Sequence, residues 1–192
     1  MTPLELAQQL KARFGETISE PTEFRGEATV KLAEAERIAE VAEFAKTSLG
    51  CDFLKDITSL DNHGEDPRWT VVYELFGLGH HCHLRLKVEV SEEKSELPTV
   101  TTVWRTADWH EREIYDMMGI RFRGHPDLRR ILMWEGYPYF PLRKDFPLAG
   151  KPTDLPDVAF ANPAPLEGGP FVTVAGGKDA IEREPRVRNP ET

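Results

Sequence analysis

Several charged side chains lie close together in the stretch EREIYDMMGI, which begins at Glu111. The spacing of residues 108–118, ended by Gly119, predicts a helix, and Glu113 and Asp116 are three residues apart and therefore share a face. Paired carboxylates can do acid–base chemistry or bind a hard metal ion. The structural alternative is that they pair with nearby arginines and fix the following loop to the helix. We favour the structural alternative, because a short motif supplies no pocket. The arginines available for such pairing are Arg121, Arg129 and Arg130.

A second group of residues, His80, His81, Cys82 and His83, has the composition of a metal site. On a strand over residues 81–90, His81 and His83 point the same way and could share a zinc or nickel ion. Cys82 would point into the core, however, and no further ligand follows at a suitable spacing. A stable site needs three or four ligands, so a solvated histidine stripe explains the pattern better. A free-standing metal-dependent enzyme that uses His81, His83 and the acidic helix stays open as an alternative.

Other features exclude several classes of function. The chain contains neither the phosphate-binding loops GxxxxGK[ST] and GxGxxG nor the nucleophile turn GxSxG. Its two cysteines, Cys51 and Cys82, lack the CxxC or CxxxC spacing of zinc and iron–sulfur sites. The net charge of -9 opposes binding to nucleic-acid phosphates. We therefore expect no cofactor in this chain and no nucleic-acid partner.

The first residues predict a capped amphipathic helix. Thr2 is placed as its N-cap, Pro3 at its first position, and Glu5 completes a capping box. This segment lacks the unbroken apolar run of a signal peptide, and no stretch approaches the ~20 apolar residues of a membrane-spanning helix. If the protein works at a membrane, we expect another subunit to hold it there.

Periodicity in the first half predicts helices packed on a sheet. Apolar residues at helical spacing alternate along the chain with short stretches of strand-like alternation. We predict an α+β fold: a small, mainly antiparallel sheet with two or three helices on it, followed by an extended docking segment and a C-terminal tail. The predicted helices span residues 3–14 and 33–49, and the predicted strands span 27–32, 51–60, 69–76 and 81–90.

The strand over residues 81–90 has the cleanest alternation. Its even-numbered residues are Cys82 and four aliphatic side chains, and its odd-numbered residues are polar or charged. One face is therefore predicted to be core and the other to be wet. Gly77 and Gly79, between this strand and the previous one, predict an antiparallel connection with positive backbone angles.

The second half combines large apolar residues with arginines, in a stretch that its prolines keep from forming long regular elements. Residues 121–145 contain six basic and three acidic residues, so this segment carries +3 and the remainder of the chain carries -12. Aromatic residues, Met and Arg are enriched at protein interfaces, and we expect a partner to cover this surface. The large apolar residues are Trp104, Trp109, Tyr115, Met117, Met118, Phe122, Met133, Trp134, Tyr137, Tyr139, Phe140 and Phe146.

The composition divides the chain into three parts. Residues 1–97 form the predicted α/β domain. Residues 98–150 contain an extended stretch up to Ala107, the acidic helix and an irregular docking segment. Residues 151–192 are rich in Pro and Gly and poor in large apolar residues, so they cannot build a core of their own. We expect this tail to lie along a partner.

The stretch EREIYDMMGIRFRGHPDLRRIL resembles the signature of the C-subunit family of NADH:quinone oxidoreductase, respiratory complex I. Some ten constrained positions match in order, which is far more specific than a lone glycine motif. PLRKDFPL, from Pro141, is similar to the family's second block, and PTVTTVWRTADW, from Pro98, is similar to its lead-in.

The resemblance implies a peripheral-arm subunit on the cytoplasmic side of the cell membrane, which reaches the membrane only through the complex. It implies packing against the D subunit, which holds the quinone site, against the iron–sulfur B subunit, and against the I subunit. FMN, iron–sulfur clusters and quinone would belong to partner subunits, and no catalytic residue to this chain. The implied interface residues are Glu111, Arg112, Glu113, Asp116, His125, Asp127, Arg129, Arg130, Pro141, Arg143, Lys144 and Asp145. Two alternatives remain: the equivalent subunit of a membrane-bound nickel–iron hydrogenase or ferredoxin-dependent relative, and a scaffold unrelated to redox chemistry.

Overall fold

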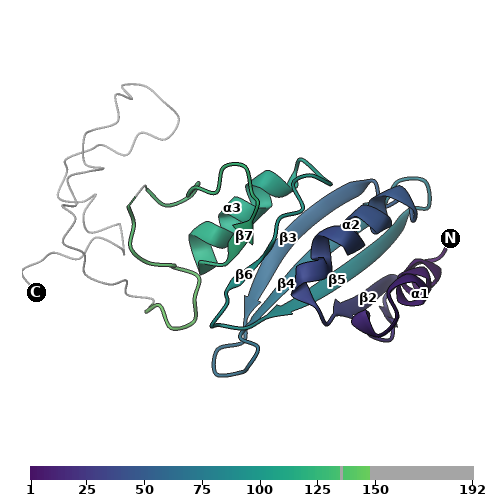
Figure 1. Cartoon of the computed structure of the whole chain (residues 1–192), viewed down its shortest axis with the longest axis horizontal. Helices are drawn as coiled ribbons and strands as arrows, with labels where there is room; N and C mark the ends of the chain where they lie inside the picture. The colour runs from purple at the N-terminus through teal and green to yellow at the C-terminus, as the bar shows by residue number, and fades with distance from the viewer. Residues whose placement is uncertain (135, 148–192) are drawn as a thin grey trace, which may run out of the picture. The chain divides into compact units, whose positions relative to one another are not determined.

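The structure is a computed structural model, and it describes residues 1–134 and 136–147 (Figure 1). Residues Met1–Asp145 form one compact unit. The predicted tail, residues 151–192, lies outside the described residues. The helices are α1 (Pro3–Phe14), α2 (Ile38–Thr47) and α3 (Ala107–Met118), with single 3-10 turns η1 (Gly15–Thr17) and η2 (Ala35–Arg37). The strands are β1 (Thr22–Phe24), β2 (Glu27–Leu32), β3 (Phe53–Asp61), β4 (Trp69–Gly77), β5 (Cys82–Val90), β6 (Glu96–Pro98) and β7 (Arg121–Arg123).

Five strands form one sheet in the order β1-β2-β5-β4-β3. All neighbouring pairs are antiparallel except β2 and β5, which are parallel. The parallel pair arises because the α2 crossover separates β2 from the β3–β4–β5 meander. The predicted α+β fold with a mainly antiparallel sheet is confirmed.

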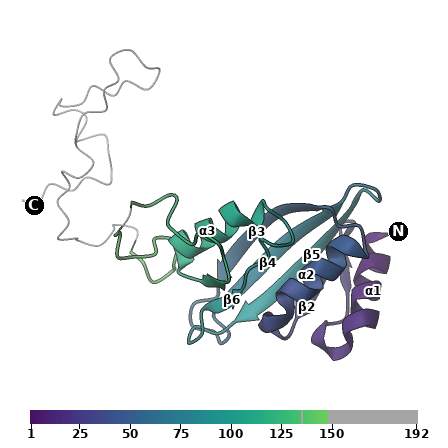
Figure 2. The ribbon, with the colours of Figure 1, turned by 45° about the horizontal axis from the view of Figure 1, so that its top comes forward.

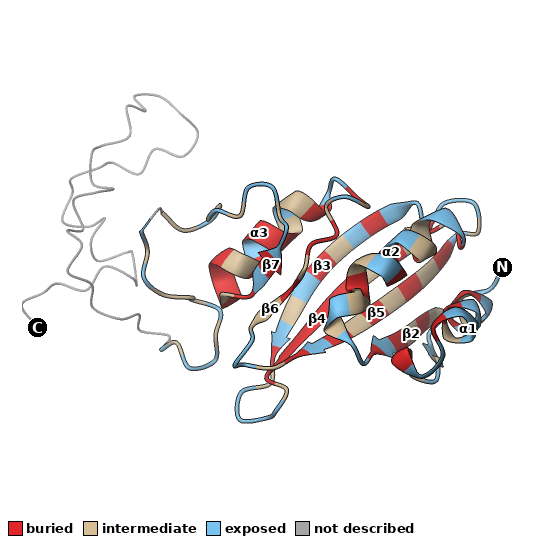
Figure 3. Ribbon diagram, in the orientation of Figure 1, coloured by how far each residue is buried: buried red, intermediate tan, exposed pale blue. Residues whose placement is uncertain are grey.

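The helices cover the face of the sheet that carries its apolar side chains. Phe14 of α1 meets Phe44 of α2 edge to face, with ring centroids 5.6 Å apart, so the two helices lie side by side. α3 packs along β3 (Figures 1 and 2), and its Ile114 and Met117 join the same core. β5 alternates between buried and less buried residues along its length, as predicted (Figure 3). Cys82 lies on the buried side of this strand.

The helix ends follow local signals. Thr2 and Glu5 make the predicted capping box at the start of α1. At the end of α3, Gly119 takes a left-handed conformation with φ 78° and its N–H donates to the carbonyl of Tyr115. A left-handed residue closes a helix at little cost only when it is glycine.

The prediction of a helix from residue 33 is wrong at its N-terminal end. The N–H of Ala33 donates to the carbonyl of Thr17, and Ile18 bridges to Leu32, so the chain is still paired as a strand there. α2 starts only at Ile38, after the η2 turn.

The prediction of an extended chain over residues 98–107 is also wrong. Only Pro98 belongs to a strand; after it the N–H groups of Val103 and Trp104 both donate to the carbonyl of Val100, which makes a tight turn into α3. β6 pairs in parallel with β7, a strand that the proline-rich pattern did not indicate.

The connection between β4 and β5 is antiparallel as predicted, but its glycines do not supply the positive angle. His81 does, with φ 51°. His81 therefore lies in the turn rather than on the strand, and the prediction that it forms a strand stripe with His83 is wrong. Both imidazole rings lie near the ring of Phe76, at centroid distances of 6.4 and 4.7 Å.

Candidate subunit interface

The C-terminal half of α3 holds the following loop through one buried carboxylate. Asp116 is fully buried, and its Oδ2 accepts the backbone N–H groups of three consecutive residues at 3.0, 2.7 and 2.8 Å. Its Oδ1 accepts a charge-assisted hydrogen bond from Arg130 at 2.6 Å. Such bonds are roughly twice as strong as neutral ones. The sequence-based hypothesis that the helix fixes the loop is confirmed here. The three N–H groups belong to Ile131, Leu132 and Met133.

The donors around Asp116 decide its ionisation. Burial alone raises the pKa of a carboxyl group. The N–H of Met133, the guanidinium of Arg130 and the two further N–H groups outweigh burial, so the pKa of Asp116 lies below its ordinary value. Asp116 is therefore a permanent negative charge at the centre of the loop.

Arg130 extends this anchor across the loop. Besides Asp116, its guanidinium donates to the carbonyl of Tyr139 at 3.1 Å. It also lies over the ring of Tyr137 at 5.7 Å and over that of Phe140 at 5.1 Å. The chain around residues 137–140 is thus tied to the same helix end as residues 131–133.

A second anchor ties residues 144 and 145 to the sheet. Arg68, immediately before β4, is buried and binds both carboxylate oxygens of Asp61, at 2.9 and 3.0 Å. Its Nη2 also reaches Asp145 at 2.9 Å, and its Nη1 reaches Glu92 at 2.5 Å. Asp61 in turn accepts the backbone N–H of Lys144 at 2.8 Å. The Arg68 guanidinium holds the pKa of Asp61 below its ordinary value, and Asp61 raises the pKa of Arg68.

Arg143 lies between the two anchors. Its guanidinium is 4.4 Å from the ring centroid of Phe140 and 5.1 Å from that of Trp69, and its Nε donates to the carbonyl of Met118 at 2.6 Å. Desolvation, and then the charge of Arg68, lowers the pKa of Arg143. A Cβ added at Gly119 would overlap the Arg143 guanidinium, so glycine there is required by packing as well as by φ.

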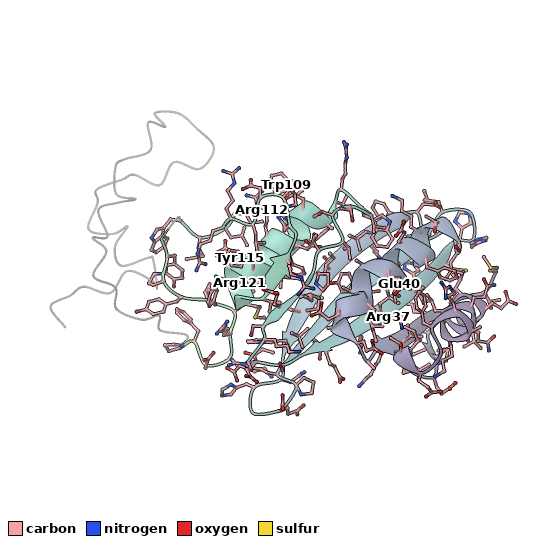
Figure 4. All side chains as sticks on the ribbon, viewed as in Figure 1. Arg37, Glu40, Trp109, Arg112, Tyr115 and Arg121 are labelled. Atoms are coloured by element: carbon pink, nitrogen blue, oxygen red, sulfur yellow. The ribbon has the colours of Figure 1, made fainter. Side chains whose placement is uncertain are left out.

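Large apolar side chains remain exposed on α3 and on the anchored loop. Trp109 on α3, Leu132 and Leu142 are 63, 61 and 58% exposed. Beneath Trp109 lies the buried Arg112, whose guanidinium is 5.1 Å from the ring and donates to the carbonyl of Arg129 at 3.2 Å (Figure 4). A fixed loop that exposes leucines beside arginines has the composition of an interface.

The N-terminal half of α3 carries a second buried carboxyl group, with a different environment. Glu111 accepts the hydroxyl of Thr99 at 2.5 Å and the N–H of Val100 at 2.7 Å. Burial raises the pKa of Glu111 to about 7, against these two hydrogen bonds. His125, whose side chain is also buried, places Nε2 at 3.5 Å from Asp108 Oδ1 and 3.9 Å from Glu111 Oε2.

The same segment carries the comparison with known families. The model for the 30 Kd subunit of respiratory-chain NADH dehydrogenase matches residues 32–152, which include α3 and both anchors. The chain belongs to this family.

Relatives in the 30 Kd subunit family align over most of both chains. A Rhizobium etli protein, named as the C 2 subunit of NADH-quinone oxidoreductase, is 46% identical over 81% of this chain and 83% of its own length. The C subunit of NADH-quinone oxidoreductase from Geotalea uraniireducens is 45% identical over 74% of this chain and 86% of its own length.

Solved structures show the same fold. The trypsin-resistant fragment 1–134 of Nqo5 is 34% identical, covers 65% of this chain and 97% of that fragment, and gives a TM-score of 0.53. A chain of the archaeal membrane-bound sulfane sulfur reductase is 20% identical, covers 88% of this chain and 98% of that one, and gives a TM-score of 0.64. The latter is a likeness of fold alone.

The residues that the family signature singled out differ in where they lie. Glu111, Arg112 and Asp116 are buried within this chain and can act on a neighbour only through the loop that they hold. Glu113 is exposed, whereas Asp116, three residues later on α3, is buried and bonded to the loop, so the two carboxylates have different environments. The His125 side chain is buried as well. Exposed or half-buried positions are Asp127, Arg129, Arg130, Pro141, Arg143, Lys144 and Asp145.

The expectation that a partner must cover the apolar residues of the second half is wrong for four of them. Trp104, Met117, Met118 and Phe122 belong to the chain's own core. They were misassigned because the proline-rich sequence does not show that α3 returns to β3.

Sequence reasoning missed the second anchor. Asp61 and Arg68 flank the β3–β4 connection, and nothing in their spacing links them to Asp145, 84 and 77 residues later. The one local signal was an arginine and an aspartate at the two ends of a hairpin, where strand pairing brings them together.

Within residues 1–134 and 136–147, no group of three His, Cys, Asp or Glu side chains could hold a metal ion. This includes His81 and His83, so the metal-dependent alternative has no geometric support there. In the same residues no helix is long and apolar enough to cross a membrane.

Proposed function

We propose that this chain is a non-catalytic structural subunit of NADH:quinone oxidoreductase that docks through α3 and the loop at residues 121–145. Its docking partners would be the D subunit, which holds the quinone site, and the iron–sulfur B subunit, with the I subunit nearby. The observation that carries this proposal is the doubly anchored loop, which fixes exposed leucines and arginines in a chain of the 30 Kd subunit family.

Preorganisation is the physical reason for the two anchors. Ordering a loop on binding costs roughly 1 kcal/mol for each immobilised side chain, and this cost is subtracted from the affinity. The carboxylates of Asp116 and Asp61 have already ordered the loop in this chain. A partner would therefore meet a fixed surface, and the subunit would hold its neighbours at fixed separation.

The charge of the segment supports the choice of surface. The whole chain carries -9, yet residues 121–145 carry three more basic than acidic residues. Arg121, Arg129 and Lys144 are exposed. A basic patch on an acidic subunit favours one orientation in an encounter with a partner.

The redox chemistry would belong to the partner subunits. A cluster is held by four thiolates in most iron–sulfur proteins, and this chain has two cysteines, both buried. FMN, the iron–sulfur clusters and quinone would therefore be bound by the neighbours, which carry electrons from NADH to quinone in a reaction coupled to ion translocation. The chain would lie on the cytoplasmic face of the membrane, held there by the complex.

Co-purification with exposed variants tests the proposal. Leu132→Asp and Leu142→Asp place a charge on the proposed interface, and Leu78→Asp is the matched control, because Leu78 is 59% exposed in the β4–β5 turn. Each variant is expressed with an affinity tag in a cell that makes the complex, and captured proteins are identified by mass spectrometry. We expect at least a tenfold loss of the D and B subunits from the two interface variants and none from Leu78→Asp.

Equal capture by all three variants would exclude this surface as the interface. Capture of hydrogenase subunits in place of an NADH-binding flavoprotein would reassign the chain to the hydrogenase-type relative.

A further inference from the structure

Glu111 is a buried carboxyl group without a strong cationic partner. It is fully buried, and among the described residues the one basic side chain within 4 Å of it is His125, at 3.9 Å. Buried carboxylates are usually matched by a nearby cation or several N–H donors. Glu111 has two donors, the hydroxyl of Thr99 and the N–H of Val100.

The hydroxyl that reaches Glu111 is part of a short chain. Thr99 Oγ1 lies 2.5 Å from Glu111 Oε2 and 2.9 Å from Thr101 Oγ1, and either threonine hydroxyl can be the donor between them. Thr99 Oγ1 also accepts the backbone N–H of Thr101 at 3.1 Å. A threonine hydroxyl donates one hydrogen bond and accepts two, so this oxygen can serve in either direction of the chain.

The hydrogen bonds that link Glu111, Thr99 and Thr101 satisfy both protonation states of Glu111. When Glu111 is ionised, Thr101 donates to Thr99 and Thr99 donates to the carboxylate. When Glu111 is protonated, its O–H donates to Thr99, and Thr99 donates to Thr101. The N–H of Val100 bonds to the other carboxyl oxygen in both cases. A change of state reverses two hydrogen bonds and breaks none, so the fold need not open.

The outer end of the chain reaches solvent. Thr101 lines an open depression of about 450 Å³. The other residues that line it come from the turn before α3, from the first turn of α3 and from the segment after β7. They are Thr102, Arg105, Asp108, Gly124 and Pro126.

The groups that face Glu111 from the other elements do not fix its charge. From β4 comes Tyr73, whose buried hydroxyl has no hydrogen-bond partner among the described residues and whose pKa is raised by burial and by Glu111. From α3 comes Asp108, with Arg112 3.9 Å from its Oδ1. His125 Nδ1 accepts the N–H of Asp127, so the ring hydrogen lies on Nε2, facing Asp108.

We propose that Glu111 is a reversible proton-binding site, loaded and unloaded through the hydroxyls of Thr99 and Thr101. A proton delivered to Thr101 from water displaces its own hydroxyl proton to Thr99, whose proton passes to Glu111; the return path releases one proton to water. Each oxygen gains one O–H bond and loses one, apart from Glu111, which gains the net proton. This proposal does not depend on the proposed function.

Burial is the main cause of the raised pKa of Glu111. It raises the pKa of Glu111 from an ordinary value of 4.5 to about 7, with a smaller contribution from the charge of Asp108. The chain would take up one proton here as the pH falls through about 7.

The test is a carboxyl titration of the full chain labelled with ¹³C-glutamate and followed by carbon-detected NMR. We expect one side-chain carboxyl resonance to titrate with a midpoint near pH 7 and to be absent from Glu111→Gln. If every glutamate titrates below about pH 5.5, within the ordinary spread of such groups, the site does not exist. This outcome needs no variant to fold.

The relay has its own control pair. Thr101→Val removes the outer hydroxyl of the relay but no direct contact of Glu111. Thr102→Val is the control, because Thr102 lines the same depression and is not a member of the relay. At the midpoint we expect the Glu111 resonance to broaden or split in Thr101→Val, because proton exchange slows, and to stay sharp in Thr102→Val. Equal line shapes in the two variants would exclude the relay.

Discussion

The two ends of α3 place a fully buried carboxyl group in opposite electrostatic situations. At the C-terminal end, three N–H groups and a guanidinium surround Asp116 and lower its pKa. At the N-terminal end, two donors meet Glu111, no guanidinium among the described residues bonds to it, and its pKa rises to about 7. Both side chains are fully buried, so the number and charge of the donors decide the outcome.

Because their pKa values shift in opposite directions, Asp116 and Glu111 have different structural roles on the same helix. Asp116 is a fixed charge, and it can hold the loop at residues 130–133 at any physiological pH. Glu111 holds the turn at residues 99–100 while its charge can change. The family signature places both carboxyls within six residues, although only one of them is an anchor.

The largest effect should come from removing the fixed charge. Asp116→Ala leaves Arg130 without its carboxylate and three loop N–H groups without an acceptor. Breaking a buried ion pair in this way costs about 3–5 kcal/mol of unfolding free energy. Denaturant unfolding measures the loss, and amide exchange at residues 131–133 should become fast.

Glu113→Ala is the control for Asp116→Ala, because Glu113 is exposed one turn earlier on the same helix. It should change the free energy of unfolding by less than about 0.5 kcal/mol. A loss of similar size in both variants would mean that the helix itself, and not the Asp116 contacts, is responsible.

The next effect concerns the Glu111 end and depends on pH. A raised pKa means that the folded chain binds more protons than the unfolded chain between the two pKa values, 4.5 and about 7. Stability from this group is therefore highest below pH 4.5 and falls as pH rises to about 7. The difference corresponds to about 3.5 kcal/mol at most, at roughly 1.4 kcal/mol per pKa unit.

Glu111→Gln should remove this pH dependence, because glutamine can accept from Val100 and donate to Thr99 as the protonated acid does. Free energies of unfolding at about pH 5 and about pH 8 should show the variant gaining stability over the parent at the higher pH. Identical pH profiles for the two proteins would contradict the raised pKa.

The pH dependence of stability from Asp116 has the opposite sign, because its pKa is lowered by folding. Its contribution to stability is present above pH 3.8 and is lost as pH falls through the lower pKa of the folded state.

A smaller effect is expected at the junction of α3 with the loop. Gly119→Ala combines a positive φ with a Cβ that would overlap Arg143 and Phe140, whereas Gly124→Ala has a similar φ of 82° and only an ordinary contact at 3.5 Å. The strain of a positive φ on alanine should be common to both variants, at about 1–2 kcal/mol. Overpacking should make Gly119→Ala worse by a further 1–2 kcal/mol or so. Equal midpoints in thermal unfolding would show that Arg143 moves aside freely.

Local signals in the sequence were sufficient for much of the fold. The capping box of α1, the alternation of β5 and the glycine that ends α3 are each determined by neighbours within a few residues, and each is confirmed. The late start of α2 was not predictable in this way, because the pairing of Ala33 with Thr17 is made across a turn.

The contacts of the candidate interface also differ in whether the sequence predicts them. The pairing of Asp116 with Arg130 spans 14 residues and could be predicted from the charges, whereas the hydrogen bonds from the N–H groups of residues 131–133 could not. The contact of Arg68 with Asp145 spans 77 residues and depends on where β4 begins, so a single sequence gives no sign of it. The raised pKa of Glu111 was equally hidden, because desolvation follows from burial and not from residue type.

Hydroxyl-radical footprinting of the chain, alone and assembled with its partner subunits, tests the docking surface most directly. In the free chain, Leu132, Leu142 and Leu78 should be modified to a similar extent, because all three are about 60% exposed. On assembly, modification of Leu132 and Leu142 should fall several-fold while that of Leu78 stays unchanged. Unchanged modification of Leu132 and Leu142 in the assembled complex would contradict the account.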